Sequence, residues 1–191
     1  MNIQSFDPSQ DPHSHYVPGQ PKIETLHWTV SFDFDAKRID GLVRYSFDKE
    51  GMTTLDTRGL AIARVYDAGD EDIPFSFGEP SDLLGTALSF EVPSGRVVVI
   101  AYQVSSEAQG VQWMSPELAE GHPFVYAQGE AINARTYVPC QDTPSVKFTF
   151  TAEVTVPKAL RGLIAAAEHV GRSEGAAVVH GGYPFAPTRE R

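Results

Sequence analysis

Apolar and polar residues alternate along much of the chain, beginning near residue 22. From 26 to 34 the even-numbered positions are apolar, and from 39 to 47 the odd-numbered positions carry most of the apolar residues. A period of two is typical of strands with one buried face. Asp-Ala-Lys-Arg at 35–38 separates the two runs, so the pattern predicts a β-hairpin over 26–47.

Further strand-like runs follow without any heptad or internal repeat. The run 97–104 is nearly all apolar and rich in β-branched residues, which favours a strand buried on both faces. The pattern therefore predicts an all-β fold with little helix. The other predicted strands lie at 55–57, 60–66, 73–77, 88–92, 148–156 and 177–180.

Composition limits the class of protein. The chain has 191 residues, of which 41% are apolar and 21% charged, so it is long enough for one globular domain, or at most two small ones, with a sizeable core. Its net charge of −10 argues against a nucleic-acid partner or an anionic membrane surface, since both need basic patches. A single cysteine excludes an internal disulfide, and neither a signal-like apolar region nor a membrane span is visible. We therefore expect a cytoplasmic protein.

The segment 128–145 follows neither the strand nor the helix period, although strand-like runs flank it. It contains an isolated acid, Glu130, together with Arg135, Asp142 and two prolines. Irregular polar segments between regular elements often carry binding or catalytic residues. The alternative interpretation is a structural loop, in which Arg135 and Asp142 form a pair that locks the loop, because buried charges need partners.

Several motifs around this segment closely resemble the end of the N-terminal domain of the M1 family of zinc aminopeptidases, in its leukotriene A4 hydrolase-like branch. The resemblance is strong over 112–157 and continues more weakly back to residue 23. The motifs are Val-Gln-Trp at 111–113, Ser-Pro-Glu at 115–117, His-Pro-Phe at 122–124, Gln-Gly-Glu-Ala-Ile at 128–132, Pro-Cys-Gln-Asp-Thr-Pro-Ser-Val-Lys at 139–147, Thr-Ala-Glu-Val at 151–154 and Val-Pro at 156–157.

The resemblance implies a saddle-like arrangement of mostly antiparallel and mixed sheets. It also implies that Glu130 accepts the free α-amino group of a peptide, that Gln128 lines the pocket for the first side chain, and that the Glu130–Ala131 peptide is cis. Gln128, Glu130 and Ala131 are therefore the expected substrate-binding residues. The leukotriene hydrolase itself has glutamine at the position of Glu130, so this chain resembles the ordinary aminopeptidases more closely. Cys140 belongs to a motif that does not use it as a nucleophile, and we interpret it as a packing residue.

The chain itself has no His-Glu-x-x-His motif, and its six histidines are scattered. We therefore expect no zinc site and no peptidase activity in this chain alone, with zinc held by an absent catalytic domain of the same parent chain. We interpret His13 and His15 as part of a solvated tail. The acids at 33–35 and 67–72 fit turns better than a cation site. Trp113 is expected to anchor the core.

We expect three parts of the chain: a flexible lead-in at 1–21, the β-domain at 22–180, and a mobile tail at 181–191, where the chain is truncated relative to the family. The run 158–168 has a helical composition, but Gly162 weakens a helix, and the resemblance favours a strand over 160–167. Two other functions stay open. One is a freestanding β-rich interaction or ligand-binding module with no peptidase role, and the other is a carbohydrate-binding sandwich with Tyr16 and Tyr126 as exposed aromatics.

Overall fold

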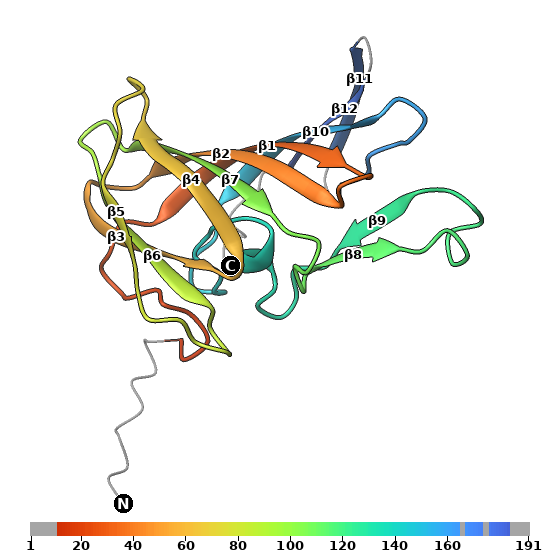
Figure 1. The fold of residues 1–191 in the computed structure, drawn as a ribbon. Helices are drawn as coiled ribbons and strands as arrows, with labels where there is room; N and C mark the ends of the chain where they lie inside the picture. Colours follow the sequence, from red (N-terminus) through yellow and green to blue (C-terminus); the bar gives the residue numbers. More distant parts are fainter. Residues whose placement is uncertain (1–10, 165–166, 174–175, 184–191) are drawn as a thin grey trace, which may run out of the picture.

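The computed structural model describes residues 11–164, 167–173 and 176–183 (Figure 1). Strands dominate this part of the chain, and its helical content is the short 3-10 helix η1 (Ala134–Thr136). The strands are β1 (Ile23–Asp33), β2 (Arg38–Phe47), β3 (Gly51–Thr57), β4 (Leu60–Asp67), β5 (Phe75–Phe77), β6 (Thr86–Val92), β7 (Val97–Val104), β8 (Val111–Met114), β9 (Phe124–Ala127), β10 (Thr149–Pro157), β11 (Ala167–Ser173) and β12 (Ala176–Tyr183).

These strands form three sheets. The large sheet has seven strands in the order β11-β12-β10-β1-β2-β7-β4, a second sheet has the order β3-β6-β5, and β8 pairs with β9 alone. The β1–β10 pair is parallel and the other pairs are antiparallel. The predicted all-β class with mostly antiparallel and mixed sheets is confirmed. In Figure 1 the large sheet crosses above the smaller sheet, and the β8–β9 hairpin projects from the side.

The hairpin predicted from the first alternation is confirmed as β1 and β2, which pair from Ile23 with Phe47 to Asp33 with Arg38. Asp33 ends β1, and its carboxylate accepts a hydrogen bond from the backbone N–H of Ala36 at 2.9 Å. It acts as a turn cap, as expected.

The acidic turn at 67–72 is confirmed as a turn. Asp67 accepts the N–H groups of Gly69 (2.7 Å) and Glu71 (3.0 Å), while Asp70 and Asp72 bind the guanidinium of Arg64. The carboxylates are thus occupied by backbone donors and an arginine.

The hydrophobic core lies between the large sheet and the β3-β6-β5 sheet. Val98, Val99 and Ile100 in β7 are all buried, whereas Gln103 near the end of the strand is exposed. The prediction of a strand buried on both faces therefore holds for the first half of β7. Trp113 is half-buried against this core, with its ring edge-on to Phe34 at a centroid distance of 5.3 Å.

The strand predicted at 160–167 is wrong. Residues 158–160 form a turn, in which the N–H of Leu160 bonds to the carbonyl of Pro157 at 2.8 Å. Residues 161–164 have no regular structure, and β11 begins only at Ala167. The turn reverses the chain directly after β10, so the next strand can start only beyond it. The strand predicted at 177–180 is confirmed within β12, which also includes residues 181–183 of the predicted tail.

The lead-in expected at 1–21 is only partly solvated over its second half, where Pro12, His13 and residues 17–19 are exposed but three residues are buried. The exposed fractions of Ser14 and Tyr16 are 5% and 3%, and Pro21 is buried. The tail expectation is wrong here because Ser14 and the backbone of His15 bind the buried carboxylate of Asp56. Burial of Tyr16 also removes one of the two aromatics behind the carbohydrate-binding interpretation. Residues 1–10 and 184–191 lie outside the described residues.

Candidate functional site

The segment 128–145 lies beneath the large sheet and contacts all three sheets (Figure 1). Its first residue, Gln128, donates its N–H to the carbonyl of Gly110 next to β8, and Cys140 forms an isolated bridge with Asp56 in β3. Residues 130–133 form a turn that leads into η1. The segment is therefore a clamped loop between β9 and β10, which we call the recognition loop.

Arg135 anchors this loop to the protein interior. Its side chain is fully buried, and Nε donates to the Asp142 carboxylate at 3.0 Å. Nη1 donates to the backbone carbonyl of Leu84 (2.9 Å), and Nη2 donates to those of His13 (2.8 Å) and Asp142 (3.1 Å). The contact between Nε and the Asp142 carboxylate confirms the predicted structural Arg135–Asp142 pair.

Asp56 is a second buried acid in the same network, and its role was not predicted. It is 1% exposed and accepts hydrogen bonds from Ser14 Oγ (2.6 Å), His15 Nδ1 (2.8 Å) and the N–H of Asp142 (3.0 Å). Its carboxylate also lies 3.6 Å from the Arg135 guanidinium. The sequence held one signal, an acid inside a predicted strand, but nothing near it in the chain identified its partners.

Two tyrosine hydroxyls attach the loop to the large sheet. Tyr45 donates to the carbonyl of Pro139, and Tyr102 donates to the carbonyl of Tyr137 at 2.8 Å. Burial raises the pKa of both tyrosines above the usual value, so the hydroxyls stay protonated and remain donors.

Cys140 lies among these groups with an exposed fraction of 3%. Burial raises the pKa of its thiol well above the usual value, and the nearby Asp142 and Asp56 carboxylates add to the shift. A thiol that stays protonated and inaccessible is a poor nucleophile. The interpretation of Cys140 as a packing residue is confirmed by its burial.

Glu130 differs from the other acids of the loop. Gln128, Glu130 and Ala131 are all exposed, and the Glu130–Ala131 peptide bond is cis. Within the described part of the chain, the Glu130 carboxylate forms no ion pair or hydrogen bond. It stands at a surface depression of about 510 Å³ lined by Gln128, Gly129, Glu130, Ala131, Ala134, Cys140, Gln141, Asp142, Thr143, Pro144, Val146 and Phe148.

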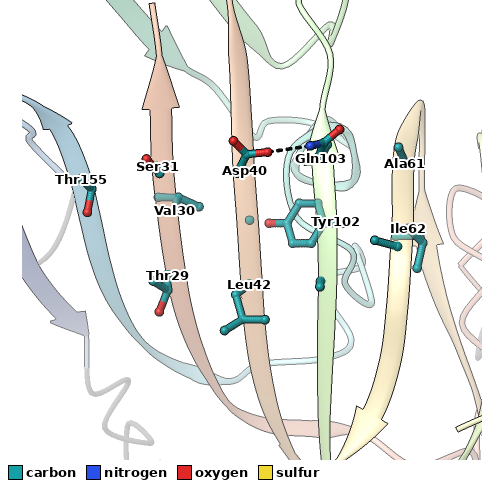
Figure 2. A pocket seen from close by; sticks show the side chains of 13 residues that line it. Thr29, Val30, Ser31, Asp40, Leu42, Ala61, Ile62, Tyr102, Gln103 and Thr155 are labelled. Atoms are coloured by element: carbon teal, nitrogen blue, oxygen red, sulfur yellow. Dashed lines mark hydrogen bonds between the residues drawn. The ribbon is translucent and has the colours of Figure 1, made fainter. Parts of the chain in front are cut away.

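A second depression of about 560 Å³ lies on the outer face of the large sheet, across β10, β1, β2, β7 and β4 (Figure 2). Its one carboxylate, Asp40, is already bound by the amide of Gln103 at 2.8 Å. Thr29, Ser31, Thr155 and Leu42 are among the other residues that line it, and none of the others is charged. An acid available to a cationic ligand is therefore found at Glu130 and not here.

The described residues contain no group of three or more histidine, cysteine or acidic side chains placed to hold a metal ion. The same residues include no helix that is long and apolar enough to cross a membrane.

Comparison with known proteins places the chain in a family. The family model of the peptidase M1 N-terminal domain matches residues 14–175. The chain belongs to the M1 peptidase N-terminal domain family. A leukotriene A-4 hydrolase from Xenopus laevis is 33% identical over 168 residues, which cover 82% of this chain and 27% of that protein. A leucine aminopeptidase 2 from Kluyveromyces lactis is 32% identical over 140 residues, covering 70% and 21%.

Solved structures share the fold of this M1 N-terminal domain. Native leukotriene A4 hydrolase from Saccharomyces cerevisiae superimposes with a TM-score of 0.78 at 22% identity, over 96% of this chain and 33% of that chain. A mutant M1 zinc metallopeptidase from Deinococcus radiodurans, bound to a Tyr-Ser-Ala substrate, gives a TM-score of 0.65 at 16% identity, over 85% and 39%. The predicted family and its leukotriene A4 hydrolase-like character are confirmed. The chain spans about a quarter of the length of its curated relatives.

Replacement of Arg135 by methionine should strongly destabilise the domain. The substitution keeps most of the side-chain volume but leaves the buried Asp56 carboxylate and the mostly buried Asp142 carboxylate without their cation, a loss of about 3–5 kcal/mol. The free energy of unfolding in urea measures the effect. Arg64→Met is the matched control, because Arg64 pairs with two acids at the surface and surface pairs contribute little. Equal stability of the two variants would contradict the role of Arg135.

The buried thiol and phenols should make the domain sensitive to alkali. Cys140 has its pKa raised from 9.0 in the folded chain, so above about pH 9 only the unfolded chain releases this proton. The free energy of unfolding should therefore be fully retained below pH 9 and fall as the pH rises. Urea titrations between pH 7.5 and 10.5 measure this fall, which should be smaller for Cys140→Ala. A Cys140 thiol that reacts with a disulfide reagent at pH 8 as fast in the folded as in the unfolded chain would refute the burial argument.

Proposed function

We propose that this chain is the N-terminal substrate-recognition domain of an M1-type zinc aminopeptidase, in which the Glu130 carboxylate binds the free α-amino group of the substrate. The observation that carries the proposal is the contrast among the acids of the site. Asp56 and Asp142 are engaged by Arg135, whereas Glu130 is exposed at the edge of a depression and its carboxylate has no ion pair or hydrogen bond among the described residues.

The chemistry of a peptide end fits such an acid. An α-ammonium group is a compact charge with three donors, and a carboxylate held at a fixed place forms charge-assisted hydrogen bonds with it. An internal peptide N–H offers one neutral donor and gains much less. Once a second domain excludes water from the site, the attraction between the ammonium and the carboxylate becomes stronger, because the local dielectric constant falls. A fixed Glu130 would thus select chain ends over internal peptide bonds.

Gln128 and Ala131 belong to the same proposal. Both are exposed and line the depression beside Glu130. Gln128 would contact the first side chain of the substrate, and Ala131 would complete the wall next to the bound amine. The neighbouring wall includes apolar residues such as Val146 and Phe148, which suits a pocket that accepts a side chain.

The catalytic partner would be the zinc domain of the same parent chain. The similar structures from Deinococcus radiodurans are longer chains described as M1 zinc metallopeptidases, and one of them is bound to a Tyr-Ser-Ala substrate. Zinc would then belong to that domain, and the described residues of this chain include no group of three or more histidine, cysteine or acidic side chains placed to hold a metal ion. Peptide-bond hydrolysis would take place only where the two domains meet.

Glu130→Gln should raise KM in a full-length zinc enzyme that carries this domain. The change keeps the shape but removes the charge, and loss of a hydrogen bond to a charged group costs about 1.5–3 kcal/mol, or roughly a 10- to 100-fold rise in KM. Steady-state hydrolysis of an aminoacyl p-nitroanilide measures it. Glu79→Gln is the control, because Glu79 is also exposed but does not line the depression. An unchanged KM for Glu130→Gln would remove Glu130 from the site.

The 191-residue chain alone should bind no stoichiometric zinc and should release no amino acid from aminoacyl anilides, because the proposal assigns the metal to another domain. Elemental analysis after dialysis against zinc, together with the anilide assay, tests this. One equivalent of bound zinc, or turnover that a chelator abolishes, would favour a chain that is catalytic by itself.

A further inference from the structure

Gly129, between the two proposed substrate-binding residues Gln128 and Glu130, has a neighbour where a side chain would begin. A Cβ atom at this position would lie 2.7 Å from the hydroxyl oxygen of Tyr137 and 3.8 Å from the ring carbon that bears it. The backbone of Gly129 does not have a positive φ. Glycine is therefore needed here for space and not for conformational freedom.

Tyr137 is itself held in place from the large sheet. Its carbonyl accepts the hydroxyl of Tyr102 at 2.8 Å, and that hydroxyl accepts Nε1 of Trp28 at 2.7 Å. The Trp28 and Tyr137 rings pack with centroids 5.9 Å apart. The sheet therefore fixes both the backbone and the ring of Tyr137.

A glycine also makes room for Tyr102. A Cβ on Gly41 would lie 2.4 Å from Cζ of Tyr102, and Figure 2 shows the Tyr102 ring extending from β7 toward β2. Gly41, like Gly129, has no positive φ. Two tyrosines, each placed against the bare Cα of a glycine, thus connect the large sheet to the residue before Glu130.

We propose that Tyr137 is the positioning residue for amine recognition: its hydroxyl, seated against Gly129, sets where the Glu130 carboxylate stands. Tyr137 does not line the depression, so it acts through the loop and does not touch the substrate. The inference rests on the proposed role of Glu130.

The contact between Tyr137 and Gly129 is a van der Waals contact. No hydrogen bond from the Tyr137 hydroxyl to another described residue is found, and the hydroxyl is not among the fully buried atoms without a partner, so water can reach it. Burial raises the pKa of Tyr137 to about 12, so the group is neutral at physiological pH. A neutral hydroxyl beside a bare Cα fills volume, and a change of volume on either side should move the loop.

A double-mutant cycle tests the inference in the full-length zinc enzyme. Gly129→Ala should raise KM for an aminoacyl p-nitroanilide about tenfold with kcat within about twofold, because the displaced loop loses binding and leaves the zinc chemistry alone. Tyr137→Phe removes the clashing oxygen and leaves the ring carbon 3.8 Å from the new methyl group, an ordinary contact. The Gly129→Ala/Tyr137→Phe double variant should therefore recover a KM within about threefold of the parent.

Gly110→Ala is the matched control. A Cβ there would lie 2.5 Å from Thr136 Oγ1, 2.7 Å from the carbonyl of Asn133 and 3.1 Å from Cδ1 of Tyr137. Tyr137→Phe keeps Cδ1 and therefore relieves none of these contacts. Recovery in the Gly129 pair but not in the Gly110 pair supports the inference. Equal recovery in both pairs, or none in the Gly129 pair, overturns it.

The two proposals fail in different ways. If Glu130→Gln raises KM but Tyr137→Phe does not rescue Gly129→Ala, the positioning role is wrong and the amine-binding role stands. If Glu130→Gln leaves KM unchanged, both proposals are wrong. Should Gly129→Ala not fold, the double variant is examined by thermal unfolding of the 191-residue chain: recovery of a cooperative transition supports the contact, and an unfolded double variant overturns it.

Discussion

The fold around the recognition loop depends on one buried cation. Arg135 compensates Asp56 and Asp142 and also binds three backbone carbonyls, including that of His13. A buried carboxylate costs much free energy unless it is paired and hydrogen-bonded. Loss of the Arg135 charge would therefore leave both carboxylates without a cation. The network joins β3, the segment before β1 and the recognition loop, which are far apart in the sequence. The charge of Arg135 is thus engaged inside the protein, and the exposed Glu130 carboxylate lies outside this network.

Much of the fold could be predicted from the local pattern of apolar and polar residues. The period of two predicted β1 and β2, because each strand buries one face and the sequence records that burial directly. The run 160–167 was misread because its composition favours a helix and the family favours a strand, whereas a turn closing onto Pro157 decided the local structure. The parallel β1–β10 pair leaves no local signature, because it joins residues more than a hundred positions apart. The division into three sheets likewise depends on which strands meet and not on the pattern within any one strand.

The exposed residues of the candidate site could be predicted from the sequence, but the buried residues that hold them in place could not. Glu130 stood out as an isolated acid in an irregular segment and through the family motif. Asp56 and Ser14 did not, because a buried acid looks the same in a sequence as an exposed one until its partners are known. The lead-in was expected to be solvated on its polar composition, yet its polar atoms are what the buried carboxylate needs. Polar residues of a segment that was expected to be solvated can thus be hydrogen-bond donors to a buried carboxylate.

The parallel pairing of β1 with β10 has a consequence for biosynthesis. Thr25 pairs with Thr149, so a growing polypeptide displays one unsatisfied edge of β1 until nearly the whole described chain has left the ribosome. An open edge of this kind is a template for pairing with other chains. The recognition loop lies just ahead of β10 in the chain, so it is already synthesised when that edge is capped.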